Sequence, residues 1–190
     1  MKKNLLILIS TLAIISCSES KVTTLEIPLT SSSQEAIDLF TNEVFRPKEA
    51  YRTYNPLVDE VLKKCVALDS QFSLAQALIG SVGYRITPEE AREKIIMAYN
   101  NIKNVTEIEA AIINSIYENE INGNISKGES ILEEIVQKYP DYYYLRIYLG
   151  QYQNLIAKNP KKSQISWEEA LRIDPNNSLA KLLLSQLHYV

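Results

Sequence analysis

The chain has 190 residues, which suits one domain with at most a short appendage. Its 20 Lys and Arg against 23 Asp and Glu leave a net charge of -3, whereas nucleic-acid binding needs a concentrated positive surface. With 46% hydrophobic residues, the composition excludes a disordered chain and a multi-pass membrane protein. Five glycines are few for an all-β fold, and one histidine with two cysteines argues against a zinc site.

The N-terminus has the layout of an export signal. Two lysines precede an apolar run of eleven residues, Leu5 to Ile15, broken only by Ser10 and Thr11. At about 1.5 Å per residue, this run is too short to cross a hydrocarbon core of about 30 Å. The pattern predicts a signal peptide over residues 1–16.

The end of this segment resembles the bacterial lipoprotein signal, with Ile14, then the small Ser16, then Cys17. The resemblance implies cleavage before Cys17 and acylation of its sulfur, which would anchor the protein in the cell envelope, at the outer membrane or the periplasmic face. An ordinary signal peptide followed by a chance cysteine is the alternative. With Cys17 acylated, Cys65 is the only thiol left, and its apolar helical pattern predicts a buried core residue.

The next residues are polar and lack helical periodicity. They are rich in serine and threonine and include Pro28. We therefore expect residues 17–32 to comprise the lipidated Cys17 and a flexible, extended tether, although the stretch 22–29 is also compatible with a short strand. The domain itself is predicted over residues 33–190.

An internal repeat of 35 residues runs through this domain. Pro140 and Pro175 are 35 positions apart, and Ser70 holds the same position 70 residues before Pro140. Small residues follow ten positions after each break, and they are Gly80, Ser115, Gly150 and Ser185. Repeats at this period are typical of stacked helix pairs.

Helix start signals agree with that period. Ser or Thr followed three residues later by Glu forms a capping box, as in Thr87–Glu90 and Thr106–Glu109, and Asn159-Pro160 is another start. Similar pairs occur at Ser32–Glu35 and Ser126–Glu129. Nine helices and essentially no strands are predicted, at 33–45, 55–69, 72–85, 88–103, 107–121, 125–139, 142–157, 160–173 and 177–190.

The spacing Trp167, Ala170, Pro175 and the pair Leu149-Gly150 resemble the tetratricopeptide repeat (TPR), a helix–turn–helix unit of about 34 residues. The resemblance covers residues 33–190 and implies an all-α superhelix, a TPR-like solenoid of about four helix pairs plus a terminal helix. Other solenoids of helix pairs remain open. The small residues of the repeat are expected to let paired helices approach closely.

In this family the first helix of each pair lines a concave groove that receives a peptide. The resemblance implies a groove here that mixes aliphatic, tyrosine and amide groups, without the Lys/Arg/Asn cluster that clamps a terminal carboxylate in related adaptors. The implied lining residues are Leu74, Ala77, Ser81, Tyr84, Glu109, Ile112, Ile116, Asn119, Tyr144, Ile147, Gln151 and Asn154.

Tyrosines are dense at the start of the seventh predicted helix, at 142, 143, 144, 148 and 152. Consecutive residues point to different faces of a helix, so some of these pack between repeats and others face water. The hypothesis beside this explanation is that Tyr144 and its neighbours form a recognition surface, and it predicts that Tyr144→Ala weakens partner capture without unfolding the domain.

The last predicted helix, 177–190, has thin polar cover for its five leucines and Val190. Repeat arrays normally end in a helix with a polar outer face. This helix is therefore predicted to meet a second copy or a partner, with a partly exposed end as the alternative.

The chain lacks the HExxH, GxSxG and phosphate-loop motifs, and no acid–base pair stands out. We therefore expect no enzyme, no cofactor and no metal. The predicted function is a membrane-anchored scaffold for protein–protein interaction in the bacterial cell envelope, with a protein or peptide in the concave groove and no nucleic-acid partner. The alternative is a binding component of an outer-membrane glycan or nutrient uptake system.

Overall fold

The computed structural model describes residues 26–45, 56–82 and 86–187. The described part of the chain is all-helical and contains no β-strand. Its α-helices are α1 (Gln34–Phe40), α2 (Pro56–Leu68), α3 (Ser73–Val82), α4 (Pro88–Asn100), α5 (Glu107–Glu120), α6 (Ile125–Lys138), α7 (Tyr143–Leu155), α8 (Pro160–Ile173) and α9 (Ser178–Leu187).

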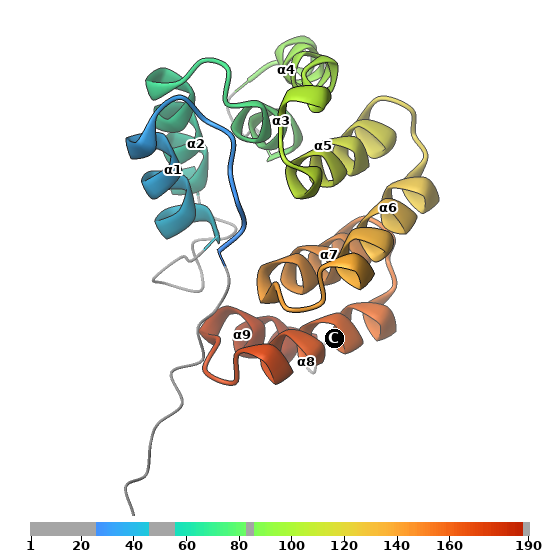
Figure 1. Ribbon diagram of the computed structural model, residues 1–190. Coiled ribbons are helices and arrows are strands. Elements are labelled where there is room, and N and C mark those ends of the chain that lie inside the picture. The colour runs from blue at the N-terminus through green and yellow to red at the C-terminus, as the bar shows by residue number, and fades with distance from the viewer. Residues whose placement is uncertain (1–25, 46–55, 83–85, 188–190) are drawn as a thin grey trace, which may run out of the picture.

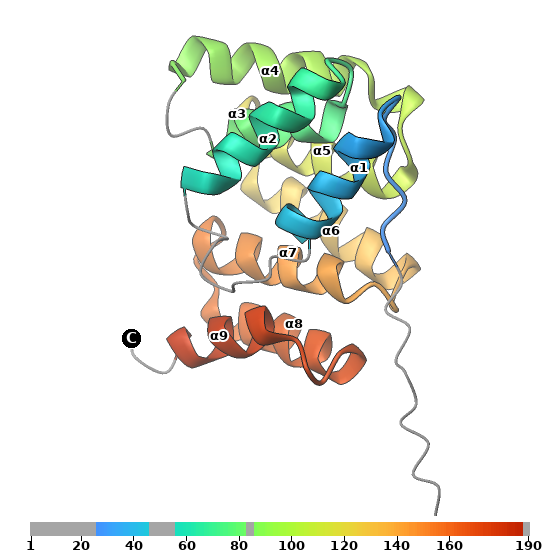
Figure 2. The ribbon, with the colours of Figure 1, turned by 90° about the vertical axis from the view of Figure 1, so that its left-hand side faces the viewer.

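The helices pack in chain order as four pairs, α1 with α2, α3 with α4, α5 with α6 and α7 with α8, followed by α9. Figure 1 shows these elements following one another around an arc, an all-α superhelical arrangement. Figure 2, turned by 90°, shows the array from the side of α1 and α2, with α4 at one end and α8 and α9 at the other. The predicted fold class, four helix pairs plus a terminal helix, is confirmed.

Several helix starts are those predicted from the sequence. Thr87 and Thr106 form complete capping boxes with Glu90 and Glu109. The Asn159 side chain caps α8, which has Pro160 in its first turn. Two predictions were wrong. Ser33, not Ser32, accepts the capping hydrogen bond of α1, and Asn124 rather than Ser126 caps α6, since the Asn124 side chain accepts from Lys127 N–H.

The small residues of the repeat lie where paired helices meet most closely. A Cβ atom on Gly80 would stand 2.7 Å from the Ala91 carbonyl oxygen on α4, and one on Gly150 would stand 2.3 Å from Nε1 of Trp167 on α8. Neither position has room for a side chain. This agrees with the close approach expected from the sequence.

The buried side chains form two clusters. The larger one runs from the N-terminal segment through α7, and the smaller one joins α7, α8 and α9 around Trp167. Cys65 belongs to the larger cluster and is fully buried, as predicted. Burial raises the pKa of its thiol to about 11, so the thiol stays protonated at neutral pH.

Candidate functional site

The most specific polar contacts in the described residues hold an extended N-terminal segment against the concave side of the helices. We call residues 26–32 the strap. It precedes α1 and runs along the inner side of the arc (Figure 1). Three residues from helix ends receive it, and we call Asp69, Thr106 and Glu109 the clasp.

Glu109 is the centre of the clasp. Its side chain is completely buried, and the Thr30 N–H donates to both carboxylate oxygens at 3.0 and 3.1 Å. The Thr30 hydroxyl donates to the same carboxylate at 2.7 Å. Thr106 completes the contact because its N–H lies 3.0 Å from Glu109 Oε2 and 3.2 Å from Thr30 Oγ1. Each of these donors satisfies a charge that is otherwise costly to bury.

Asp69 binds the far end of the strap in the same manner. The Ser31 hydroxyl and the Ser32 N–H donate to its Oδ2 at 2.6 and 2.7 Å, and Gln71 N–H donates to its Oδ1 at 2.9 Å. Burial alone raises the pKa of the Asp69 carboxyl, but these hydrogen bonds outweigh it and hold the pKa below its usual value. Asp69 therefore stays ionised in the folded protein at neutral pH.

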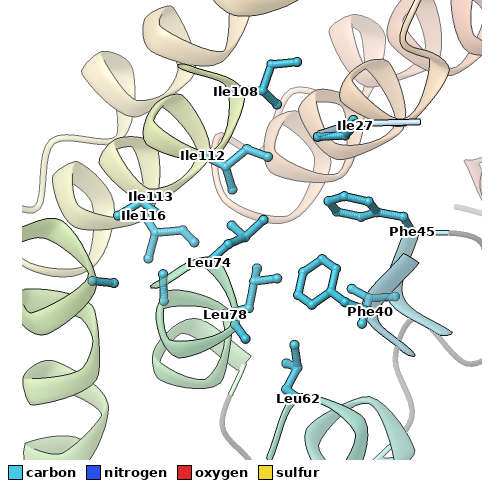
Figure 3. Close-up of a cluster of buried hydrophobic side chains, with 14 of the residues drawn as sticks. Ile27, Phe40, Phe45, Leu62, Leu74, Leu78, Ile108, Ile112, Ile113 and Ile116 are labelled. Carbon is cyan, nitrogen blue, oxygen red and sulfur yellow. The ribbon is translucent and has the colours of Figure 1, made fainter. Parts of the chain in front are cut away.

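Apolar side chains complete the contact beside the clasp. Ile27 on the strap is 5% exposed and belongs to the larger core cluster. Figure 3 shows Ile27, Phe40 and Phe45 gathered on one side of this cluster, with Leu74 and Ile112 across from them. The N-terminal segment, by which we mean residues 26–45, thus contributes side chains to the same buried cluster as α3 and α5.

The structure corrects the tether prediction for residues 26–32. This stretch is extended, as expected, but it is bound to the domain through Ile27, Thr30 and Ser31 and is not a free spacer. Residues 17–25, and with them Cys17, lie outside the described residues, as does the predicted signal peptide.

Half of the residues that the tetratricopeptide resemblance implies for a groove lining are buried. Six of the implied lining positions are at most 4% exposed, so they offer a partner almost no surface in this structure. Their contact with a peptide stays a prediction. These six are Leu74, Ala77, Glu109, Ile112, Ile116 and Ile147.

The other six residues predicted to line the groove are less buried or lie outside the described part of the chain. Ser81, Asn119, Tyr144, Gln151 and Asn154 are half-buried, and Tyr84 lies outside the described residues. Tyr144 packs against Phe45 with ring centroids 4.1 Å apart, so it also holds the end of the N-terminal segment in place. The expectation that Tyr144→Ala weakens partner capture without unfolding the domain stays a prediction, and the substitution would also remove this ring contact.

One stripe of side chains along α7 keeps partial contact with solvent. Tyr144, Tyr148, Gln151 and Leu155 recur at intervals of four, three and four residues, which places them on one stripe of the helix. The first three are half-buried and Leu155 is 42% exposed. We call this stripe the α7 face. Ile147 and Asn154 fall beside it, and Ile147 turns toward α8, where Trp167 Nε1–H donates to its carbonyl oxygen at 3.2 Å.

The surroundings of the α7 face are partly desolvated and polar. Burial raises the pKa values of Tyr144 and Tyr148, so both phenols remain neutral. Glu120, on α5, contributes to this shift at Tyr148, and its own pKa is raised because burial outweighs the hydrogen bond from Asn119. Sequence reasoning missed Glu120 and Leu155, although their positions one turn from Ile116 and Gln151 are a signal that could have found them.

The dense tyrosines of the sequence serve separate purposes. Tyr143 is buried in the smaller cluster, and Tyr152 donates its hydroxyl hydrogen to the Ile125 carbonyl oxygen at 3.0 Å. Tyr142 precedes α7 and packs edge-on to Tyr139, with ring centroids 6.0 Å apart. Only Tyr144 and Tyr148 therefore belong to the α7 face.

The outer side of α9 carries the thin polar cover that the sequence predicts. Leu179 and Leu183 are buried, and the helix presents exposed Lys181, Ser185 and Gln186. The half-buried Leu182, Leu184 and Leu187 are what this helix offers a neighbour. Contact with a second copy or a partner through residues 177–190 stays a prediction.

Within residues 26–45, 56–82 and 86–187, no three His, Cys, Asp or Glu side chains come together as metal ligands would. Over the same ranges, every helix is too short or too polar to span a bilayer. No family model, curated protein or solved structure matches this chain. The tetratricopeptide resemblance therefore stays a prediction that rests on the quoted residues.

Proposed function

We propose that this chain is a lipid-anchored scaffold in the bacterial cell envelope that holds a protein partner through its α7 face and catalyses no reaction. The lipoprotein-like residues Ile14, Ser16 and Cys17 support the anchor, and the tetratricopeptide-like repeat supports the binding role. The single observation that carries the proposal is the α7 face, because its side chains keep partial contact with solvent whereas Ile112 and Ile116 on α5 are buried.

The chemistry of the α7 face suits a protein surface. Tyr144 and Tyr148 offer large aromatic contact area, Gln151 offers both hydrogen-bond donors and acceptors, and Leu155 is an exposed apolar anchor. Aromatic residues with few long charged side chains are typical of the centre of protein interfaces.

Site-specific crosslinking in intact cells tests the binding role. A photo-reactive residue at Gln151 is expected to trap envelope proteins, whereas the same residue at Gln137, exposed on α6, traps at least about tenfold less. Equal crosslinking from both positions would contradict the proposal. If the protein instead serves glycan uptake, sugars will raise its melting temperature while neither position captures protein.

Cell fractionation tests the anchor. Cys17→Ala is expected to move the protein from the membrane to the soluble fraction, because several acyl chains on one cysteine are needed for stable attachment. Cys65→Ala is the matched control, since it removes the other thiol, which is buried on α2, and leaves Cys17 in place. Membrane association that survives the loss of Cys17 would exclude a lipid anchor on that residue.

A further inference from the structure

We propose that the clasp is a binding site for extended peptide segments that carry hydroxyl side chains, and that the strap is its resident ligand. This site lies apart from the α7 face and depends neither on the lipid anchor nor on the scaffold role. Its ligand class is an apolar residue followed, three and four positions later, by Thr and Ser, as in Ile27, Thr30 and Ser31.

The strap is bound through its main chain, as a peptide ligand is. The Pro28 carbonyl oxygen accepts from the Thr106 hydroxyl at 3.1 Å, and the N–H groups of Thr30 and Ser32 donate to Glu109 and Asp69. The three strap residues alternate, as the period of an extended chain requires. Main-chain hydrogen bonds give affinity for any extended segment, and side-chain contacts then provide selectivity.

Selectivity comes from the hydroxyl groups. The Thr30 hydroxyl donates to Glu109 at 2.7 Å and accepts from the Thr106 N–H at 3.2 Å, so this position requires a group that does both. The Ser31 hydroxyl donates to Asp69 at 2.6 Å. A valine in place of Thr30 would leave the buried carboxylate short of a donor, which is costly.

The clasp is organised by its own helix ends and does not need the strap for its shape. Glu109 and Thr106 form the capping box of α5, and Asp69 accepts from Gln71 at the turn that follows α2. A site that is already formed binds with little loss of conformational entropy. When the strap leaves, the carboxylates therefore remain in position to receive another segment of the same chemistry.

The strap itself is shallowly held compared with the helices. Pro28 and Ser32 are exposed, and Leu29, Thr30 and Ser31 are half-buried, so Ile27 alone is inserted deeply. Segments with few buried contacts open at lower free energy than the core. In hydrogen exchange on the full chain, the Thr30 amide is expected to exchange at least about tenfold faster than the Ile112 amide of α5. Exchange of both only on global unfolding would overturn the proposal.

Peptide binding to the full chain gives the direct test. Thr30→Pro removes the N–H and the hydroxyl that reach Glu109, whereas Thr30→Ser keeps both and is the matched control. A fluorescent peptide with the sequence of residues 26–33 should bind the Thr30→Pro protein at least about tenfold tighter than wild type or Thr30→Ser, as measured by anisotropy. In the wild type, the tethered strap competes at high effective concentration.

Two further measurements distinguish specific binding of the peptide to the clasp from non-specific binding. Adding Glu109→Gln to the Thr30→Pro protein should weaken peptide binding about tenfold, and so should valine at the peptide position that matches Thr30. If Thr30→Pro loses its helical circular dichroism, Ile27→Ser replaces it as the variant that releases the strap. Equal binding to wild type and the released variant, or no binding to the released variant, would overturn the proposal.

Discussion

Helices α5 and α7 both present a stripe of side chains to the concave side, yet the stripe on α5 is buried and that on α7 is only half-buried. Ile112 and Ile116 are 1% and 4% exposed, and they belong to the same buried cluster as Ile27 of the strap. Gln151 and Leu155 keep contact with solvent. The position of a residue in a helix repeat therefore does not decide whether it binds a partner. Whether the residue is available to a partner depends on which other parts of the chain pack against it.

The largest expected effect is on the covered half. Phe40→Ala should lower the free energy of unfolding by about 3–5 kcal/mol, because the ring is fully buried against the rings of Phe45 and Phe72. Tyr148→Ala on the open half should cost less than half as much, since that side chain is half-buried. Urea denaturation of both variants checks this, and equal losses would remove the distinction between the two halves.

The next effect isolates the clasp. Glu109→Gln should cost about 1.5–3 kcal/mol, because a charged acceptor that serves Thr30 and Thr106 is lost. Glu90 occupies the equivalent capping-box position of α4 but is exposed and receives no strap, so Glu90→Gln should cost less than about 1 kcal/mol. Thermal unfolding of the pair measures the difference. If both variants have the same melting temperature, the contact between the strap and Glu109 does not contribute to the stability of the fold.

A smaller effect depends on pH. The pKa of Asp69 in the folded state is lowered below its ordinary value of 3.8. As the pH falls, the unfolded chain therefore binds a proton at Asp69 before the folded chain does. The stabilisation it provides is complete above that value and is lost as the pH falls through the lowered pKa. Asp69→Asn should flatten the fall of the urea midpoint below pH 4, whereas Asp141→Asn, on the exposed turn before α7, should keep the wild-type slope. An unchanged slope in Asp69→Asn would show that other groups control acid unfolding.

Local sequence signals were enough to predict the helices but not what covers them. Thr87 and Thr106 predicted the starts of two helices, because a capping residue bonds to the backbone only three residues away. Gly150 and Trp167 predicted a close contact between two consecutive helices. The bond between Thr30 and Glu109 joins residues 79 positions apart, and an extended segment without periodicity gives no sign of its partner. The groove prediction therefore identified Glu109 as a concave residue but could not show that it is occupied.

The smallest effect on stability is expected on the α7 face, where Gln151→Ala should change the free energy of unfolding by less than about 0.5 kcal/mol. Gln151 is half-buried, and no side chain of the strap or clasp reaches it in the described contacts. Gln137→Ala, on exposed α6, is the matched control and should behave alike in urea. A loss above about 1 kcal/mol for Gln151→Ala alone would mean that this side chain supports the fold. The α7 face would then be covered core like its counterpart on α5, and the partner surface would have to lie elsewhere.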